Sequence, residues 1–78
     1  MSDKKEREEF LKRFGEYLYK IRTEKDISLG ELSRRTFIDK PNITRIEKGR
    51  MNPSIYVLRK LCKGLEIELK DFLKEFED

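Results

Sequence analysis

The sequence predicts an all-α domain of five helices, and two observations carry this prediction. Apolar residues recur three and four positions apart along most of the chain, which is the spacing of one helix face, and no segment alternates convincingly as a strand does. Capping residues, prolines and glycines interrupt this pattern at four places. The 78 residues allow one domain with a small core.

Residues 1–25 are expected to form one long first helix. Gly15 lies inside its apolar stripe and costs about 1 kcal/mol relative to alanine, which indicates that another helix approaches closely there. Residues 1–9 carry almost no apolar side chains, so we expect a charged extension that frays, with contact to DNA or to a partner as the alternative. The domain proper spans residues 10–76. The apolar stripe consists of Phe10, Leu11, Phe14, Tyr17, Leu18 and Ile21.

Two short helices and a tight turn are expected between Ser28 and Gly49. Ser28 and Glu31 have the spacing of a capping box, so a helix should begin just after Ser28. Asp39 can cap the next helix, and Pro41 is tolerated in its first turn, where N–H groups have no helical partner. Gly49 supplies a left-handed stop. Two helices of about two turns joined in this way form a helix-turn-helix.

The outer face of segment 40–48 is unusual. Ile43 and Ile46 should face inward, and at about 100° per residue the opposite face carries three cations, a hydroxyl and no carboxylate. Such a face suits a groove lined by phosphates and base edges, while an ordinary solvated surface is the alternative. Asn42 lies on its flank. The residues of this face are Lys40, Pro41, Thr44, Arg45 and Lys48.

Two further helices complete the predicted domain. Asn52 can cap the fourth, with Pro53 at its first position and Ile55, Val57, Leu58, Leu61 and Cys62 as its apolar positions. Gly64, Leu65 and Glu66 make the break. Residues 68–77 should form the fifth helix, with an apolar face of Leu69, Phe72, Leu73 and Phe76.

The net charge of +3 is unevenly distributed. Residues 31–60 hold eight lysines and arginines against three acidic residues, whereas residues 61–78 hold three against six. Positive potential is therefore concentrated around the predicted groove-facing helix, as a phosphate-binding surface requires.

Several kinds of chemistry are excluded by composition. The chain has no histidine and a single cysteine, so we expect no structural zinc, no other metal or cofactor, and no internal disulfide. Cys62 should be a small core residue, with a redox-sensing thiol as the alternative. No nucleophile stands beside a base and no glycine-rich loop cradles a phosphate, so we do not expect an enzyme. The absence of a signal peptide or a long apolar run predicts a cytoplasmic protein without membrane contact.

The chain resembles the lambda-repressor-like helix-turn-helix family of Xre or Cro/C1 type over about residues 10 to 75. The similarity consists of F-G-x-x-L-x-x-I-R at 14–22, K-x-I-S at 25–28, E-L-S at 31–33, I-T-R-I-E-K-G at 43–49, N-P-S at 52–54 and L-R-K-L-C-K-G-L-E-I-x-L-x-D-F-L at 58–73. The size is also similar to that of restriction-modification controller proteins, which is a looser match.

The resemblance implies roles for individual residues. Base reading falls on Lys40, Pro41, Thr44 and Arg45, and a structural ion pair is implied between Arg22 and Glu47. We expect phosphate contacts from Ser28, Arg34, Arg35, Asn42, Lys48, Arg50 and Asn52, where Asn52 can instead be only a helix cap.

This chain also departs from the family pattern. Leu29 stands where many members carry a phosphate-binding glutamine. Phe37 replaces the usual glycine of the turn, so we expect a turn of a different type with Phe37 buried.

The resemblance and the charge pattern together imply a transcriptional regulator that binds double-stranded DNA as a homodimer on a two-fold symmetric operator. The interface is expected on Leu65, Ile67, Leu69, Leu73 and Phe76, some of which should also complete the monomer core. The alternative is an antitoxin-like interaction module whose acidic C-terminal segment contacts a protein partner of unknown identity.

Overall fold

The protein folds into five helices, as the sequence predicts. The computed structural model describes residues 3–77, and no strand occurs within this range. The helices are α1 (Asp3–Glu24), α2 (Leu29–Thr36), α3 (Lys40–Glu47), α4 (Ile55–Gly64) and α5 (Leu69–Glu77).

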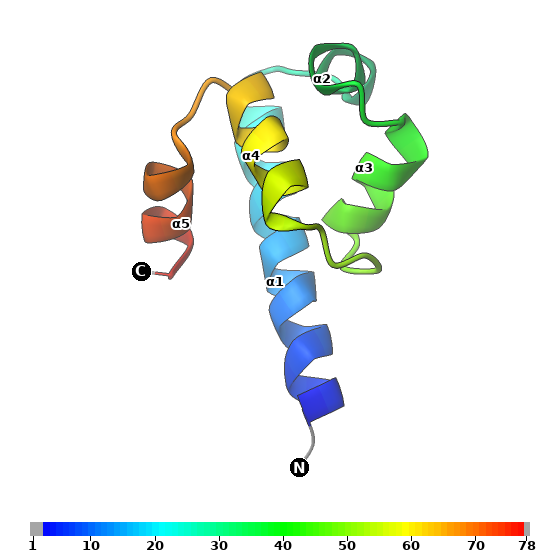
Figure 1. The fold of residues 1–78 in the computed structure, drawn as a ribbon, viewed down its shortest axis with the longest axis vertical. Coiled ribbons are helices and arrows are strands. Elements are labelled where there is room, and N and C mark those ends of the chain that lie inside the picture. Colours follow the sequence, from blue (N-terminus) through cyan, green and yellow to red (C-terminus); the bar gives the residue numbers. More distant parts are fainter. Residues whose placement is uncertain (1–2, 78) are drawn as a thin grey trace.

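Helix α1 is the long axis of the molecule (Figure 1). Its 22 residues account for most of the 39 Å longest dimension. Helix α3 packs on α1, α2 packs on both α3 and α4, and α5 packs on α4. In Figure 1, α3 and α5 lie on opposite sides of α1 and α4, and the N-terminal turns of α1 project past the other helices. This arrangement leaves one long side of α3 uncovered.

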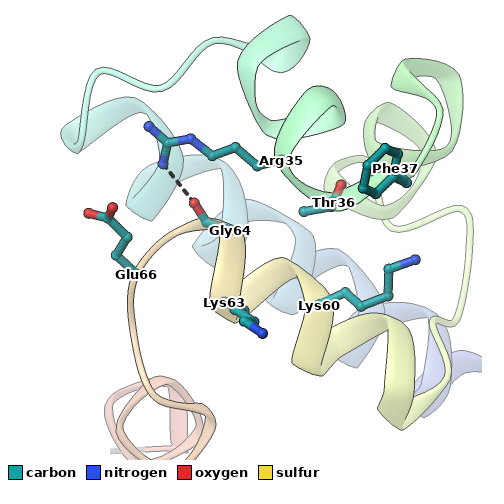
Figure 2. A pocket seen from close by; sticks show the side chains of 7 residues that line it. All are labelled: Arg35, Thr36, Phe37, Lys60, Lys63, Gly64 and Glu66. Carbon is teal, nitrogen blue, oxygen red and sulfur yellow. Dashed lines mark hydrogen bonds between the residues drawn. The ribbon is translucent and has the colours of Figure 1, made fainter.

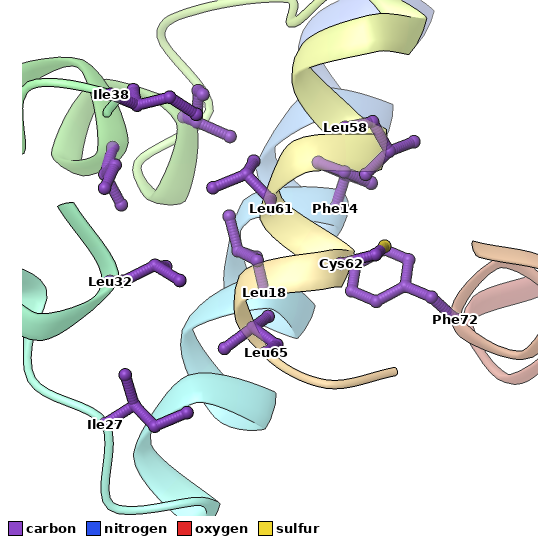
Figure 3. Close-up of a cluster of buried hydrophobic side chains, with 12 residues drawn as sticks. Phe14, Leu18, Ile27, Leu32, Ile38, Leu58, Leu61, Cys62, Leu65 and Phe72 are labelled. Atoms are coloured by element: carbon purple, nitrogen blue, oxygen red, sulfur yellow. The ribbon is translucent and has the colours of Figure 1, made fainter. Parts of the chain in front are cut away.

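The core draws on every helix and on three of the connections (Figure 3). Two residues that we expected in apolar stripes are exposed: Phe10 is 41% exposed and Ile55 is 68% exposed. Ile55 is the first residue of α4. The buried apolar residues are Phe14, Leu18, Ile27, Leu32, Ile38, Ile43, Ile46, Leu58, Leu61, Cys62, Leu65 and Phe72.

Helix α4 begins two residues later than predicted. The hydroxyl of Ser54 accepts a hydrogen bond from the N–H of Val57 at 3.1 Å, so Ser54 is the cap. Asn52 and Pro53 precede the helix, and the expectation that Asn52 caps it is wrong. Pro53 instead lies before the helix and lines an apolar hollow together with Leu73.

Left-handed residues end most of the helices. Asp26, Phe37 and Glu66 have φ near 60°, and Gly49 has φ of 75°. The left-handed conformation expected of Gly49 is therefore confirmed. After three of these residues an isoleucine turns back toward the core, which is the hydrophobic contact that accompanies such helix ends. These isoleucines are Ile27, Ile38 and Ile67.

Our expectation for Phe37 is wrong on both points. Its φ is 60°, in the region that favours glycine, and its side chain is 89% exposed. The strain, about 1–2 kcal/mol for a residue with a Cβ, is offset by the hydrogen bonds of the turn and by the burial of the next residue. The N–H of Phe37 donates to the carbonyl of Ser33 at 2.8 Å, and the side chain of Ile38 is buried in the core. Ser33 also donates its hydroxyl to the carbonyl of Ile38 at 2.6 Å, which fixes the turn.

Candidate nucleic-acid interface

Helix α3 has the two-faced character that its sequence predicts. Ile43 and Ile46 are 0% and 1% exposed and attach the helix to the core. On the other side Lys40, Pro41 and Arg45 are exposed, and Thr44 is half-buried. The predicted face of α3 is thus free of covering elements within the described chain.

The first turn of α3 needs little capping. Asp39 occupies the cap position with extended backbone but makes no side-chain capping bond, so only the predicted position is confirmed. Pro41 lies in the first turn, where its missing N–H removes no helical bond. The N–H groups of Asn42 and Ile43 both donate to the carbonyl of Asp39.

A shallow concave surface joins α3 to the start of α2. It is lined by the four expected base-reading residues and by Ser28, and no carboxylate lines it. The hydroxyl of Ser28 accepts the N–H of Glu31 at 3.0 Å, which leaves its own O–H free to donate to an anion. The lining consists of Ser28, Leu29, Gly30, Lys40, Pro41, Thr44 and Arg45.

The side chain of Arg45 is held by a hydrogen bond within α3. Its Nη1 donates to Oδ1 of Asn42 at 2.6 Å across one turn of α3. This bond uses only one of the five guanidinium N–H donors, so the others can reach a planar acceptor pair. Asn42 therefore acts in this structure as a support for Arg45.

A buried ion pair holds α3 against α1. Arg22 Nε lies 2.7 Å from Glu47 Oε2, and Arg22 Nη2 donates to Glu47 Oε1 at 3.1 Å. Nη1 of the same guanidinium donates to the carbonyl of Ile27 at 2.9 Å. The two side chains are 8% and 7% exposed. The implied pair is present, and its planar two-point geometry fixes the angle of α3.

Gly15 makes this close packing possible. A Cβ at Gly15 would lie 2.3 Å from the carbonyl oxygen of Glu47 and 2.4 Å from that of Ile46. Only a residue without a side chain fits there, so the expected close approach of another helix is confirmed, and the helix is α3.

The arginines of α2 are engaged with other groups. Arg34 and Arg35 both donate to the carboxylate of Glu31, the latter at 2.9 Å, and these hydrogen bonds, that of Arg34 first, hold the pKa of Glu31 below its usual range. Arg35 also donates to the carbonyl of Gly64 at 2.8 Å (Figure 2). The Glu31 carboxylate thus accepts hydrogen bonds from the two arginines and does not accept one from the N–H of Ser28, as a complete capping box would require. Arg35 braces α2 against α4, whereas Arg34, with 72% of its side chain exposed, stays open to solvent.

The loop after α3 places further cations next to this surface. Lys48, Arg50 and Asn52 are exposed, and the N–H of Arg50 donates to the carbonyl of Arg45 at 2.8 Å. Gly49 turns the chain, and a Cβ there would lie 2.7 Å from Cα of Lys12 in α1. The loop is therefore seated directly on α1.

The expected dimer surface is only partly available. Leu65 is 0% exposed within one chain, so its place at an interface is wrong; it closes the core after α4. Ile67, Leu69, Leu73 and Phe76 are half-buried and pack against the core edge. The ring of Phe76 contacts Phe10, Phe14 and Tyr17 with centroids 5.4, 5.6 and 5.5 Å away.

Other site chemistry finds little support in the part of the chain that the structure describes. No group of three or more metal-binding side chains occurs among residues 3–77, and no described helix is long and apolar enough to cross a membrane. Cys62 is a buried free thiol whose pKa burial raises to about 11, which confirms it as a core residue and makes a reactive thiolate unfavourable.

Comparison with known proteins agrees with this geometry. Residues 18–78 match the Cro/C1-type HTH DNA-binding domain family. The chain is 35% identical over 66 residues to the control protein C.MunI of Mycoplasma sp, covering 83% of this chain and 89% of that protein.

Solved structures are similar over most of their length. The restriction-modification controller protein C.AhdI from Aeromonas hydrophila has a TM-score of 0.76 at 31% identity, covering 80% of this chain and 94% of the other. The controller protein C.Esp1396I, solved as a tetramer with its natural 35 base-pair operator, has a TM-score of 0.80 at 28% identity, covering 86% and 88%. These relatives are controller proteins, in agreement with the expectation that the chain is not an enzyme. The chain belongs to the Cro/C1-type helix-turn-helix family of DNA-binding domains.

Proposed function

We propose that this protein is a sequence-specific transcriptional regulator that places α3 in the major groove of double-stranded DNA. The observation that carries this proposal is the carboxylate-free concave surface of α2 and α3, held in place by the buried Arg22–Glu47 pair. An α-helix fits the major groove, and its N-terminal residues are the ones that reach base edges. The family of the chain and the operator complex of C.Esp1396I support the same function.

The residues of the concave surface have chemically distinct roles. Arg45 offers two parallel donors to O6 and N7 of guanine, and Lys40 can reach the same atoms or a phosphate. Pro41 and Thr44 present apolar carbon to a thymine methyl group.

Phosphate contacts surround these residues on both sides. Ser28 and the free N–H groups at the start of α2 contact one strand, with the exposed Arg34 beside them. Lys48, Arg50 and Asn52 contact the backbone from the loop after α3. Asn42 supports Arg45, and Arg35 contributes positive charge from its position between α2 and α4.

The proposed regulator acts as a homodimer. One α3 helix reads only a few base pairs, and two copies related by a two-fold axis double the recognised sequence. The half-buried face of α5, with Ile67, Leu69, Leu73 and Phe76, is the proposed interface. Leu69→Glu should shift the protein toward monomer in sedimentation, whereas Ile55→Glu, at an exposed apolar position elsewhere, should not. A Leu69→Glu protein that stays dimeric would move the interface away from this face.

Two substitutions separate base reading from phosphate binding. Arg45→Ala should cost about 1–3 kcal/mol for each half-site of the preferred sequence and relax preference at one base pair of each half-site. Lys48→Ala should weaken binding to preferred and random DNA alike and reduce the slope of log affinity against log salt by about 0.9 for each protomer, or about 1.8 for the bound dimer. Titrations of labelled duplexes at several salt concentrations give both quantities. A uniform loss in Arg45→Ala would make Arg45 a phosphate contact and would remove the main evidence for sequence reading.

One observation favours the second candidate, an antitoxin-like module that binds a protein. Phe37 is 89% exposed at the rim of a hollow that Lys60 and Lys63 also line (Figure 2), and such an exposed ring is typical of protein contacts. Capture of a specific protein by the wild type, lost in Phe37→Ala, would support this candidate. For the leading proposal, a regulator that binds DNA, the location that we propose is the cytoplasm.

A further inference from the structure

A second cationic surface lies where α1 passes the loop after α3. A depression of about 710 Å³ is lined by Arg7 and Lys12 of α1 and by Lys48 and Arg50 of the loop, with Glu8 as its single carboxylate. The polar side chain of Asn52 and the apolar side chain of Leu11 complete the lining. The depression therefore has a net charge of +3.

The four cations of this depression are held together by the fold. Gly49 packs on the backbone of α1 so closely that a Cβ would lie 2.7 Å from Cα and 2.9 Å from N of Lys12. This contact fixes the position of the loop along α1. None of the four cationic side chains has a hydrogen bond or ion pair with another residue of the described range. In contrast, Arg22, Arg34 and Arg35 are paired with carboxylates.

The position of the depression relative to α3 determines its ligand. A helix of eight residues is about 12 Å long, close to the width of the major groove, which is about 12 Å. If the first turn of α3 lies at the base edges, its last residues lie beside the phosphates that border the groove. Lys48 and Arg50 stand there, and the N-terminal turns of α1 extend past the loop that carries them (Figure 1).

We propose that Arg7 and Lys12 form an additional DNA-backbone site, so that α1 extends the contact beyond the phosphates that Lys48 and Arg50 bind. This proposal rests on the proposed function, because it takes the same DNA as its ligand. The ligand is a run of phosphates on one strand and not a base edge, since a cluster of cations with no shaped hydrogen-bonding partners neutralises charge without reading sequence. The charged N-terminal turns of α1 then serve DNA affinity.

Single-charge variants test this site on an operator-length duplex selected with the wild-type protein. Arg7→Gln and Lys12→Gln should each reduce the salt slope by about 0.9 for each protomer, or about 1.8 for the bound dimer, and weaken selected and random duplexes by the same factor. Lys20→Gln removes one exposed charge of α1 that does not line the depression and lies about 140° around the helix from Gly15, which contacts α3, so it should leave the slope unchanged. Glu8→Gln should have the opposite effect, with tighter binding, because it removes the one repelling carboxylate of the depression. Circular dichroism verifies that each variant is folded.

The outcomes distinguish this proposal from the function on which it rests. If Lys48→Ala flattens the salt slope but Arg7→Gln, Lys12→Gln and Glu8→Gln all match the wild type, the additional site is refuted and DNA binding by α3 stands. If Lys20→Gln lowers the slope as much as Lys12→Gln, the effect is one of net charge and the site is again refuted. If the wild type selects no sequence from random DNA, the proposed function fails, and this site with it.

Discussion

Removal of Arg22 should destabilise the protein more than any other single charge change. Its guanidinium makes two hydrogen bonds to Glu47 and one to the carbonyl of Ile27, and both charged side chains are more than nine-tenths buried. Arg22→Met would leave the Glu47 carboxylate buried without its partner. Loss of one partner of such a pair costs about 3–5 kcal/mol.

This loss is large compared with the stability of so small a domain. A domain of this size has a free energy of unfolding of about 4–12 kcal/mol, at about 0.05–0.15 kcal/mol per residue. With a urea dependence of about 1 kcal/mol per molar, the midpoint should fall by about 3 M or more. Urea titrations followed by circular dichroism measure this shift directly.

Two control variants make the result specific. Arg34→Met breaks the exposed pair with Glu31 and should cost under about 1 kcal/mol. Arg22→Met/Glu47→Leu removes both buried charges and should recover much of the stability, because a buried pair replaced by apolar residues is often near neutral. The reasoning is refuted if Arg22→Met loses no more stability than Arg34→Met, or if the double variant is less stable than Arg22→Met.

Three further predictions concern the fold. Gly15→Ala should destabilise the protein by about 1–3 kcal/mol because its Cβ meets the α3 backbone. Gly30→Ala, whose Cβ meets nothing closer than 3.6 Å, should stabilise the protein by about 0.4–1 kcal/mol. Thermal denaturation distinguishes the two variants, and equal effects would contradict the close packing at Gly15. Phe37→Gly should stabilise by about 0.5–1 kcal/mol because it relieves the left-handed strain and uncovers no core; a destabilised protein in the same assay would show that the ring contributes packing. Burial raises the pKa of Cys62 to about 11 in the folded protein, so the neutral thiol contributes fully to the free energy of unfolding below pH about 9, and this contribution is lost as the pH rises toward 11. The wild type should therefore lose more stability over this pH range than Cys62→Ala. Identical profiles of stability against pH would contradict this.

The helices and the face of α3 follow from local patterns in the sequence. The three-and-four spacing of apolar residues reports which side of a helix is buried, and this was sufficient to place Lys40 and Arg45 opposite Ile43 and Ile46. Gly15 was informative because a glycine inside the apolar stripe of a helix indicates that the backbone of another helix approaches closely there. The pairing of Arg22 with Glu47, 25 positions apart, came only from family resemblance, because no local rule connects them.

The errors arose where tertiary packing overrides local preference. Phe37 takes a conformation that its type disfavours because Ile38 must reach the core. Asn52 and Pro53 are good helix starters, but the hydroxyl of Ser54 caps α4, and Pro53 lies before the helix, where it lines an apolar hollow. The cationic depression between α1 and the loop after α3 left only a weak signal in the sequence. Its lysines and arginines lie in two segments about 40 residues apart, as Arg7 does from Lys48 and Arg50, and no local pattern connects them.

The most direct test of the central claim is selection of bound sequences from random double-stranded DNA at about 150 mM salt, where non-specific binding is weak. If α3 reads bases and the protein is a homodimer, the selected pool should converge on an inverted repeat whose half-sites lie about one helical turn apart. Arg45→Ala should lose preference at one position of each half-site. A pool with no enriched sequence would contradict sequence-specific DNA binding, and an enriched site without two-fold symmetry would contradict the dimer.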